Sequence, residues 1–178
     1  MNFSQEKSET DGKVMETNYS NYRKEKSDKA KEYQDFVCKY MIQNYGIVLS
    51  IFSSKKYQHE IGESMQGIEI KYDIKSSETG NFYIEIGEKA EPREGEYYPS
   101  GIYANDNSWL YFIGNYNILY VFSKKQLQTI FAKKFYYRRI EHNETKTSEG
   151  YLLDKERAEK YCILKINFLT NVKRTSIL

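Results

Sequence analysis

Two stretches of alternating residues contain the side chains in this sequence that could do chemistry. In residues 67–75 and again in residues 82–89, charged and apolar residues follow each other in turn. Because side chains of a β-strand point alternately to opposite faces, each stretch predicts a strand with one apolar and one charged face. If the polar residues between them close a hairpin, pairing of the isoleucines places Asp73 and Lys71 beside Glu85.

Two carboxylates and an ammonium on one patch are typical of metal-assisted phosphodiester hydrolysis. Mg²⁺ takes oxygen ligands and keeps several waters, so one or two carboxylates can hold it against a phosphate. We therefore predict that Asp73 and Glu85 bind Mg²⁺ or Mn²⁺, with Glu63 as a further candidate ligand or an ordinary loop acid. Lys71 would position the attacking water and offset charge on the phosphate. The alternative is an ordinary solvated face on which these charges pair with one another.

The length of the chain and its charge distribution limit the classes of partner that it could bind. A chain of 178 residues suits one domain, and a formal charge of +2 gives no basic field over the whole molecule. Residues 107–140 nevertheless contain no acid. We predict that this basic segment binds a nucleic-acid backbone, DNA in preference to RNA, and the alternative is the solvated face of a helix. Its cations are Lys124, Lys125, Lys133, Lys134, Arg138 and Arg139.

The cysteine and histidine content points to a compartment. Two cysteines and two histidines are too few for a disulfide framework and show no zinc spacing. We therefore expect a reduced, cytoplasmic environment. The sequence has no apolar run of membrane-spanning length, so we expect no membrane partner.

The elements that position the charged strands begin with an N-terminal helix. Residues 1–26 are polar and aperiodic and predict a flexible or partly helical arm, followed by a single α/β domain over residues 27–178. Apolar residues at helical spacing predict a helix that begins after Ser27 or Asp28 and ends at Gly46.

The rest of the chain alternates between short strands and helices. Residues 90–108, which include both prolines, predict an irregular loop that could face a substrate. Residues 53–65 and 141–150 predict loops. Further predicted elements are strands at residues 47–52, 109–113, 118–122 and 163–169, a helix capped by Ser123, and a short helix at residues 154–161.

The order of these elements resembles the PD-(D/E)XK nuclease superfamily, with its restriction-endonuclease-like fold, over residues 28–134. In that superfamily an aspartate ends the second core strand and a Glu-x-Lys motif lies on the third strand. Asp73 and Glu85 match the two acidic positions. The resemblance implies an α/β fold in which one mixed β-sheet, with a central charged β-hairpin, is flanked by helices.

The sequence departs from the family pattern at one position. Gly87 stands where the family lysine belongs, so Lys71 on the neighbouring strand would have to supply the ammonium. Lys89 is a less well-placed candidate for that role. This departure puts retained catalysis in doubt.

A second alignment takes Glu69, Ile70 and Lys71 as the Glu-x-Lys motif, with Glu60 or Glu63 as the preceding acid. We rank it lower, because the spacing from Glu63 to Glu69 is tight for a strand, a turn and a second strand.

These observations lead to a Mg²⁺-dependent DNA endonuclease as the first hypothesis. Restriction-like enzymes commonly dimerise to cut both strands, so the resemblance also implies a homodimer. The second hypothesis is a non-catalytic module that binds nucleic acid or protein, such as a degenerate nuclease, an inhibitor or an adaptor. The third is an interaction module that meets a protein partner through Tyr97, Tyr98 and Tyr103.

Overall fold

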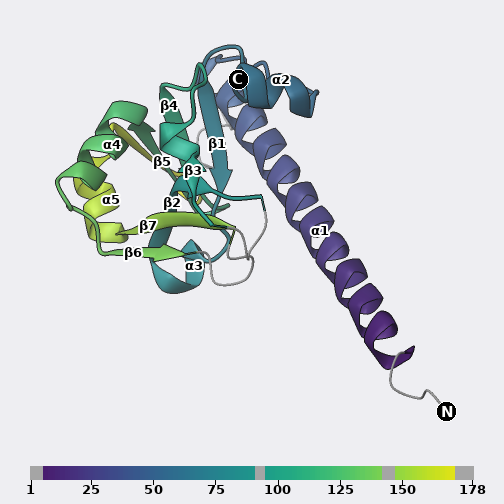
Figure 1. The fold of residues 1–178 in the computed structure, drawn as a ribbon. Coiled ribbons are helices and arrows are strands. Elements are labelled where there is room, and N and C mark those ends of the chain that lie inside the picture. Colours follow the sequence, from purple (N-terminus) through teal and green to yellow (C-terminus); the bar gives the residue numbers. More distant parts are fainter. Residues whose placement is uncertain (1–5, 91–94, 142–146, 171–178) are drawn as a thin grey trace.

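The structure, a computed structural model, describes residues 6–90, 95–141 and 147–170, with side chains from residue 24 onward. Two four-stranded sheets form the body, and helices pack around them (Figure 1). The longest element is α1 (Glu6–Tyr45), which packs against the first sheet, while its N-terminal half extends away from the body.

Helix α1 begins much earlier than the sequence indicated. The prediction of a start after Ser27 or Asp28 is wrong, because the helix is continuous from Glu6. Residues 6–26 contain no proline and many glutamates and lysines, which favour a helix even without an apolar face. The helix ends before Gly46, as predicted, and this glycine has the positive φ of 68° that suits a residue without a side chain.

The first sheet is mixed, in the order β1-β4-β5-β8. Strand β1 pairs parallel with β4, and the other pairs are antiparallel. Its strands are β1 (Ile68–Tyr72), β4 (Leu110–Gly114), β5 (Ile118–Ser123) and β8 (Leu164–Asn167). One face packs against α1 through a buried cluster that includes Tyr33, Val37, Ile68, Ile70 and Phe112. The predicted strands at residues 109–113, 118–122 and 163–169 are thereby confirmed.

The second sheet is antiparallel, in the order β3-β2-β7-β6. Its strands are β3 (Tyr98–Pro99), β2 (Asn81–Glu88), β7 (Ser148–Asp154) and β6 (Arg138–Glu141). Strands β6 and β7 occupy part of residues 141–150, so the prediction of a loop there is wrong in its described part. Residues 142–146 lie outside the described residues.

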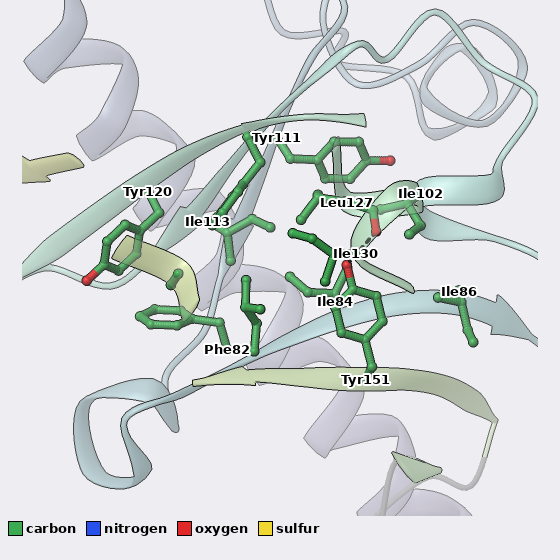
Figure 2. Packing of buried hydrophobic residues seen from close by; sticks show 13 residues of the cluster. Phe82, Ile84, Ile86, Ile102, Tyr111, Ile113, Tyr120, Leu127, Ile130 and Tyr151 are labelled. Carbon is green, nitrogen blue, oxygen red and sulfur yellow. Dashed lines mark hydrogen bonds between the residues drawn. The ribbon is translucent and has the colours of Figure 1, made fainter. Parts of the chain in front are cut away.

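A buried cluster joins the two sheets to the remaining helices (Figure 2). Side chains from both sheets meet Leu127 and Ile130 of α4 (Lys124–Ala132) and Ala158 of α5 (Lys155–Tyr161). The Tyr151 hydroxyl donates to the Leu127 carbonyl oxygen at 2.9 Å, so this buried polar group is satisfied. The turn η1 (Gly101–Tyr103) contributes Ile102 to the same cluster.

The predicted charged hairpin does not form. Strands β1 and β2 belong to different sheets, and the short helix α3 (Ser76–Thr79) carries the chain from one to the other. Ile68 and Ile70 pack toward α1, whereas Ile84 and Ile86 pack in the cluster between the sheets. The isoleucines therefore never face one another, and the fold has two sheets where a single mixed sheet was expected.

Some of the helices and strands predicted from short sequence patterns are present in the structure, and others are not. The Ser123 cap is confirmed, because its Oγ accepts the Gln126 N–H at 3.1 Å. The short helix predicted at residues 154–161 is also confirmed, with Asp154 as its cap. The prediction of a buried strand at residues 47–52 is wrong. Within this segment only Ile51 makes an isolated bridge, and Val48 is exposed. Helix α2 (Lys55–Glu60) lies within a predicted loop.

Candidate functional site

A cavity of about 710 Å³ lies between the two sheets, next to α1 and α3. Lys71 and Asp73 line it from β1 and the residue that follows this strand, and Glu85 lines it from β2. The three side chains that the sequence placed on one hairpin face therefore reach the same cavity by a different topology. A concave site with converging polar groups is the usual location of a ligand or active site.

Lys71 lies at the centre of the charges in this cavity. Its Nζ is 2.5 Å from Oε1 of Glu69, whose residue is only 8 % exposed. Glu69 raises the pKa of the Lys71 ammonium most strongly, and Glu85 and Glu63 raise it further against the opposing effect of burial. The Lys71 side chain is 44 % exposed, so a bound ligand can still reach it. We call Glu63, Glu69, Lys71 and Glu85 the acid–lysine cluster.

Glu69 is held in place by the segment before β4. Ser108 Oγ donates to its Oε2 at 3.3 Å. Ser108 is fixed in turn, because its N–H donates to Asp106 Oδ1 at 3.0 Å. Lys124 Nζ pairs with the same Asp106 oxygen at 2.8 Å and also donates to the Ala104 carbonyl oxygen at 2.7 Å. Lys124 thus supports this segment, where the sequence suggested a cation facing nucleic acid.

Glu85 is positioned from two sides. Ser100 Oγ donates to Oε1 at 2.6 Å, and Ser148 Oγ donates to Oε2 at 3.0 Å. Gly101, which follows Ser100, approaches so closely that an added Cβ would lie 2.4 Å from the Glu85 carbonyl oxygen. Both the side chain and the backbone of Glu85 are therefore fixed by neighbouring elements.

Both carboxylate oxygens of Asp73 accept hydrogen bonds from the backbone. Its Oδ1 accepts the Ser76 N–H at 3.0 Å, and its Oδ2 accepts the Tyr83 N–H at 2.7 Å. Burial raises the pKa of this carboxyl, and these backbone donors oppose the rise. Both oxygens thus tie the start of α3 to the start of β2. In the part of the chain that the structure describes, no group of three or more histidine, cysteine, aspartate or glutamate residues is arranged to hold a metal ion.

Glu63, by contrast, belongs to the cluster. Its Oε1 accepts the Ile70 N–H at 2.8 Å, which places the carboxylate beside β1. Burial raises the pKa of Glu63 to about 7, although Lys71 acts in the opposite direction. Both acids of the second alignment that includes Glu63, Glu63 and Glu69, therefore act on the charge of Lys71. Glu69 was the residue that the preferred alignment missed, and its Glu-x-Lys spacing with Lys71 was the signal.

The raised pKa of Glu63 predicts a pH dependence of stability. Its ordinary pKa is 4.5 and its folded value is about 7, so the folded state holds an extra proton between these values. The free energy of unfolding should therefore fall as the pH rises through this window. Relative to that of Glu63→Gln, the free energy of unfolding of the wild type should fall by about 2–3 kcal/mol between pH 5 and pH 8.

Urea unfolding of both proteins at the two pH values measures this difference. The glutamine side chain of the variant retains an oxygen that can accept the Ile70 N–H, so the comparison isolates the proton. If the difference in free energy of unfolding between the two proteins is the same at both pH values, Glu63 is not a buried group that titrates in this range.

The cations of the predicted basic segment have different surroundings in the structure. Arg138 lines the cavity. Arg139 pairs with Glu149 at 2.6 Å and lies over the Phe131 ring. Lys125, Lys133 and Lys134 are exposed on α4 and just after it, where they could be a solvated face. The cations of the cavity itself are Lys26, Lys71, Lys75 and Arg138.

Two further expectations can be compared with the structure. Cys38 and Cys162 are free cysteines, in agreement with the absence of a disulfide framework. No helix within the described ranges is long and apolar enough to pass through a bilayer. Comparison of the chain with protein-family models, with curated proteins and with solved structures gave no match.

Proposed function

We propose that this protein is a metal-dependent phosphodiester hydrolase that cuts DNA at the acid–lysine cluster. One observation carries the proposal: Lys71, paired with Glu69 at 2.5 Å, lines a cavity together with Glu85 and further cations, and Glu63 and Glu85 also act on its charge. Carboxylates can anchor a hard cation, and an ammonium beside them can contact a phosphate oxygen. Lys71 and Glu85 supply one group of each kind to the lining of the cavity.

The proposal includes restriction-endonuclease-like ancestry through the second alignment. Glu69 and Lys71 would be the Glu-x-Lys pair, with Glu63 as the preceding acid, and Glu85 would be a further acid at the cavity. The ion pair between Lys71 and Glu69 and the effect of Glu63 on the same ammonium support this alignment over the one that uses Asp73. Asp73 is engaged by backbone donors and would serve the fold.

No three acids of the described residues form a ready metal site, so a hard divalent cation such as Mg²⁺ or Mn²⁺ would be held by two carboxylates and completed by water and substrate. The acidic donors of the cluster are all oxygens, which are the ligands that hard divalent cations take. Glu69 and Glu85 would hold the ion, with waters and a substrate phosphate filling the other positions. Once bound, the ion would lower the pKa of water and polarise the phosphate.

The residues of the chain would then perform the remaining steps. Glu63, whose pKa of about 7 lies near neutrality, can accept the proton that the attacking water releases. The water oxygen bonds to phosphorus, the bond to the leaving sugar oxygen breaks, and that oxygen gains a proton from solvent. Lys71 faces the phosphate and offsets the negative charge that increases on its oxygens.

The expected result is cleavage of labelled DNA by purified wild-type protein with Mg²⁺ or Mn²⁺ and none with EDTA. Glu85→Gln, purified in the same way, should lose most of this activity. Glu88→Gln is the matched control, because Glu88 is exposed on the same strand and does not line the cavity. Gel electrophoresis of single-stranded, duplex and branched substrates measures the products.

Folded wild-type protein that cuts none of these substrates would end the enzyme proposal. The non-catalytic binding module would then be the better interpretation. The direct ion pair between Lys71 and Glu69 favours it as the second candidate, since such a pair can simply neutralise a buried acid.

Compartment and assembly are further parts of the proposal. The two free cysteines support a reduced, cytoplasmic location. A homodimer would be needed if both strands of a duplex are cut together, and light scattering in the presence of DNA tests it.

A further inference from the structure

The cavity beside the acid–lysine cluster has walls of two kinds. Its interior is apolar, with Ile84, Ile102 and Ile113 from three different elements. Its edge is polar: Tyr137 is 60 % exposed, and the next residue, Arg138, is also exposed. A volume of about 710 Å³ lies within the range of cavities that bury one small organic molecule.

Positive charge reaches this edge from separate parts of the fold. Lys26 comes from α1, Lys75 precedes α3, and Arg138 comes from β6. A flat apolar body with an anionic group attached would match this combination of walls. An unpaired nucleotide has that form, because its base can stack on a tyrosine while its phosphate meets cations.

We propose that the cavity binds one unpaired nucleotide of a single-stranded nucleic acid. Its base would lie against Tyr137 and the apolar interior, and its phosphate would lie between Lys75 and Arg138. A base inside an intact duplex cannot enter a pocket of this size unless it is first taken out of the stack. The proposal rests on the proposed function for the reaction, and it adds that the substrate is a single strand or an unpaired site.

Binding can be measured separately from cleavage. A fluorescein-labelled thymidine oligonucleotide and a duplex of the same length are each titrated with wild-type protein in EDTA, and anisotropy gives the dissociation constants. The single strand should bind on the order of tenfold more tightly than the duplex. Thymidine 5′-monophosphate should compete with the single strand for the cavity.

Variants locate the binding. Tyr137→Ala and Arg138→Gln should each weaken binding of the single strand by about tenfold. Tyr57→Ala and Lys55→Gln are matched controls, since both residues are exposed and neither lines the cavity, and both variants should bind as the wild type does. Ala30→Phe is a second probe, because Ala30 lines the cavity from α1 and a phenyl ring there would fill it. It should abolish competition by the monophosphate, whereas Gln43→Phe, on an exposed position of α1, should not.

The outcomes distinguish this inference from the proposed function. Equal affinity for single strand and duplex, or unchanged affinity in Tyr137→Ala, Arg138→Gln and Ala30→Phe, would overturn the nucleotide cavity. Cleavage of duplex without preference for unpaired sites would do the same and leave the hydrolase intact. Tight, cavity-dependent binding of the single strand without any cleavage would support the cavity and refute the hydrolase.

Discussion

Lys71→Ala should lower the single-turnover rate of DNA cleavage on the order of 10²-fold or more while DNA affinity stays near that of the wild type. In the structure the Lys71 ammonium pairs with Glu69 at 2.5 Å, is influenced by Glu85 and Glu63, and remains open to the cavity. It is therefore placed to contact a phosphate oxygen whose charge increases in the transition state. Loss of such a contact affects the rate more than the binding of the ground state.

The control for this experiment is Lys89→Ala. Lys89 does not line the cavity, and its Nζ is 3.5 Å from Glu141 Oε1. Its removal should leave the cleavage rate within a few-fold of the wild type. The melting temperature of Lys71→Ala must also be recorded, because Glu69 loses its partner and a buried unpaired charge is destabilising. A folded Lys71→Ala protein with the wild-type rate would remove this lysine from the chemistry.

Asp73→Ala should destabilise the fold by about 2–4 kcal/mol, because one backbone N–H group loses its acceptor and a second keeps only the Asp73 carbonyl oxygen at 3.3 Å. These groups belong to Ser76 and Tyr83, at the point where the chain passes between the sheets. In a chain of this length the change corresponds to a fall in melting temperature of about 5–15 °C. Asp73→Asn keeps one accepting oxygen and should show about half of that fall.

Thermal unfolding measured by circular dichroism tests this series, with Asp28→Ala as the control on an exposed position of α1. The same experiment with added Mg²⁺ separates the two roles of Asp73. A ligand that binds only the folded state raises the melting temperature. If Mg²⁺ stabilises the wild type and Asp73→Asn equally, Asp73 is not a ligand. A rise confined to the wild type would restore the metal site that the first alignment placed at Asp73.

The parts of the fold that the sequence predicted well depend on neighbours in the chain. Strands β4 and β5 are adjacent apolar runs joined by a short turn, and the following helix starts at a serine cap. Each of these signals is complete within a few residues. The hairpin prediction failed because alternation shows which face of a strand is apolar, but it does not show which sheet the strand joins. The four-residue helix α3 leads the chain from β1 in the first sheet to β2 in the second sheet.

The site was predicted only in part for a related reason. Lys71 and Glu85 do reach one cavity, since both alternating strands line it. The alignment that uses Glu63 and Glu69 was ranked lower because it was assumed to need a full strand before β1. The segment between these two residues is too short for a strand, a turn and a second strand. In the structure Glu63 lies in a turn, and Ser64 Oγ both accepts the Ile68 N–H and donates to the Ile68 carbonyl oxygen. This local turn brings Glu63 back to β1 without a second strand.

The contact between Gly101 and Glu85 limits how this protein can diverge. A methyl group at position 101 would meet the backbone of Glu85, and the positive φ of 53° also disfavours a side chain there. Exposed residues such as Tyr137 can be replaced without displacing a buried side chain. At the corner beside Glu85, even the smallest side chain would shift an acid of the cluster. Descendants of this chain can therefore change what enters the cavity more readily than they can change the geometry around Lys71.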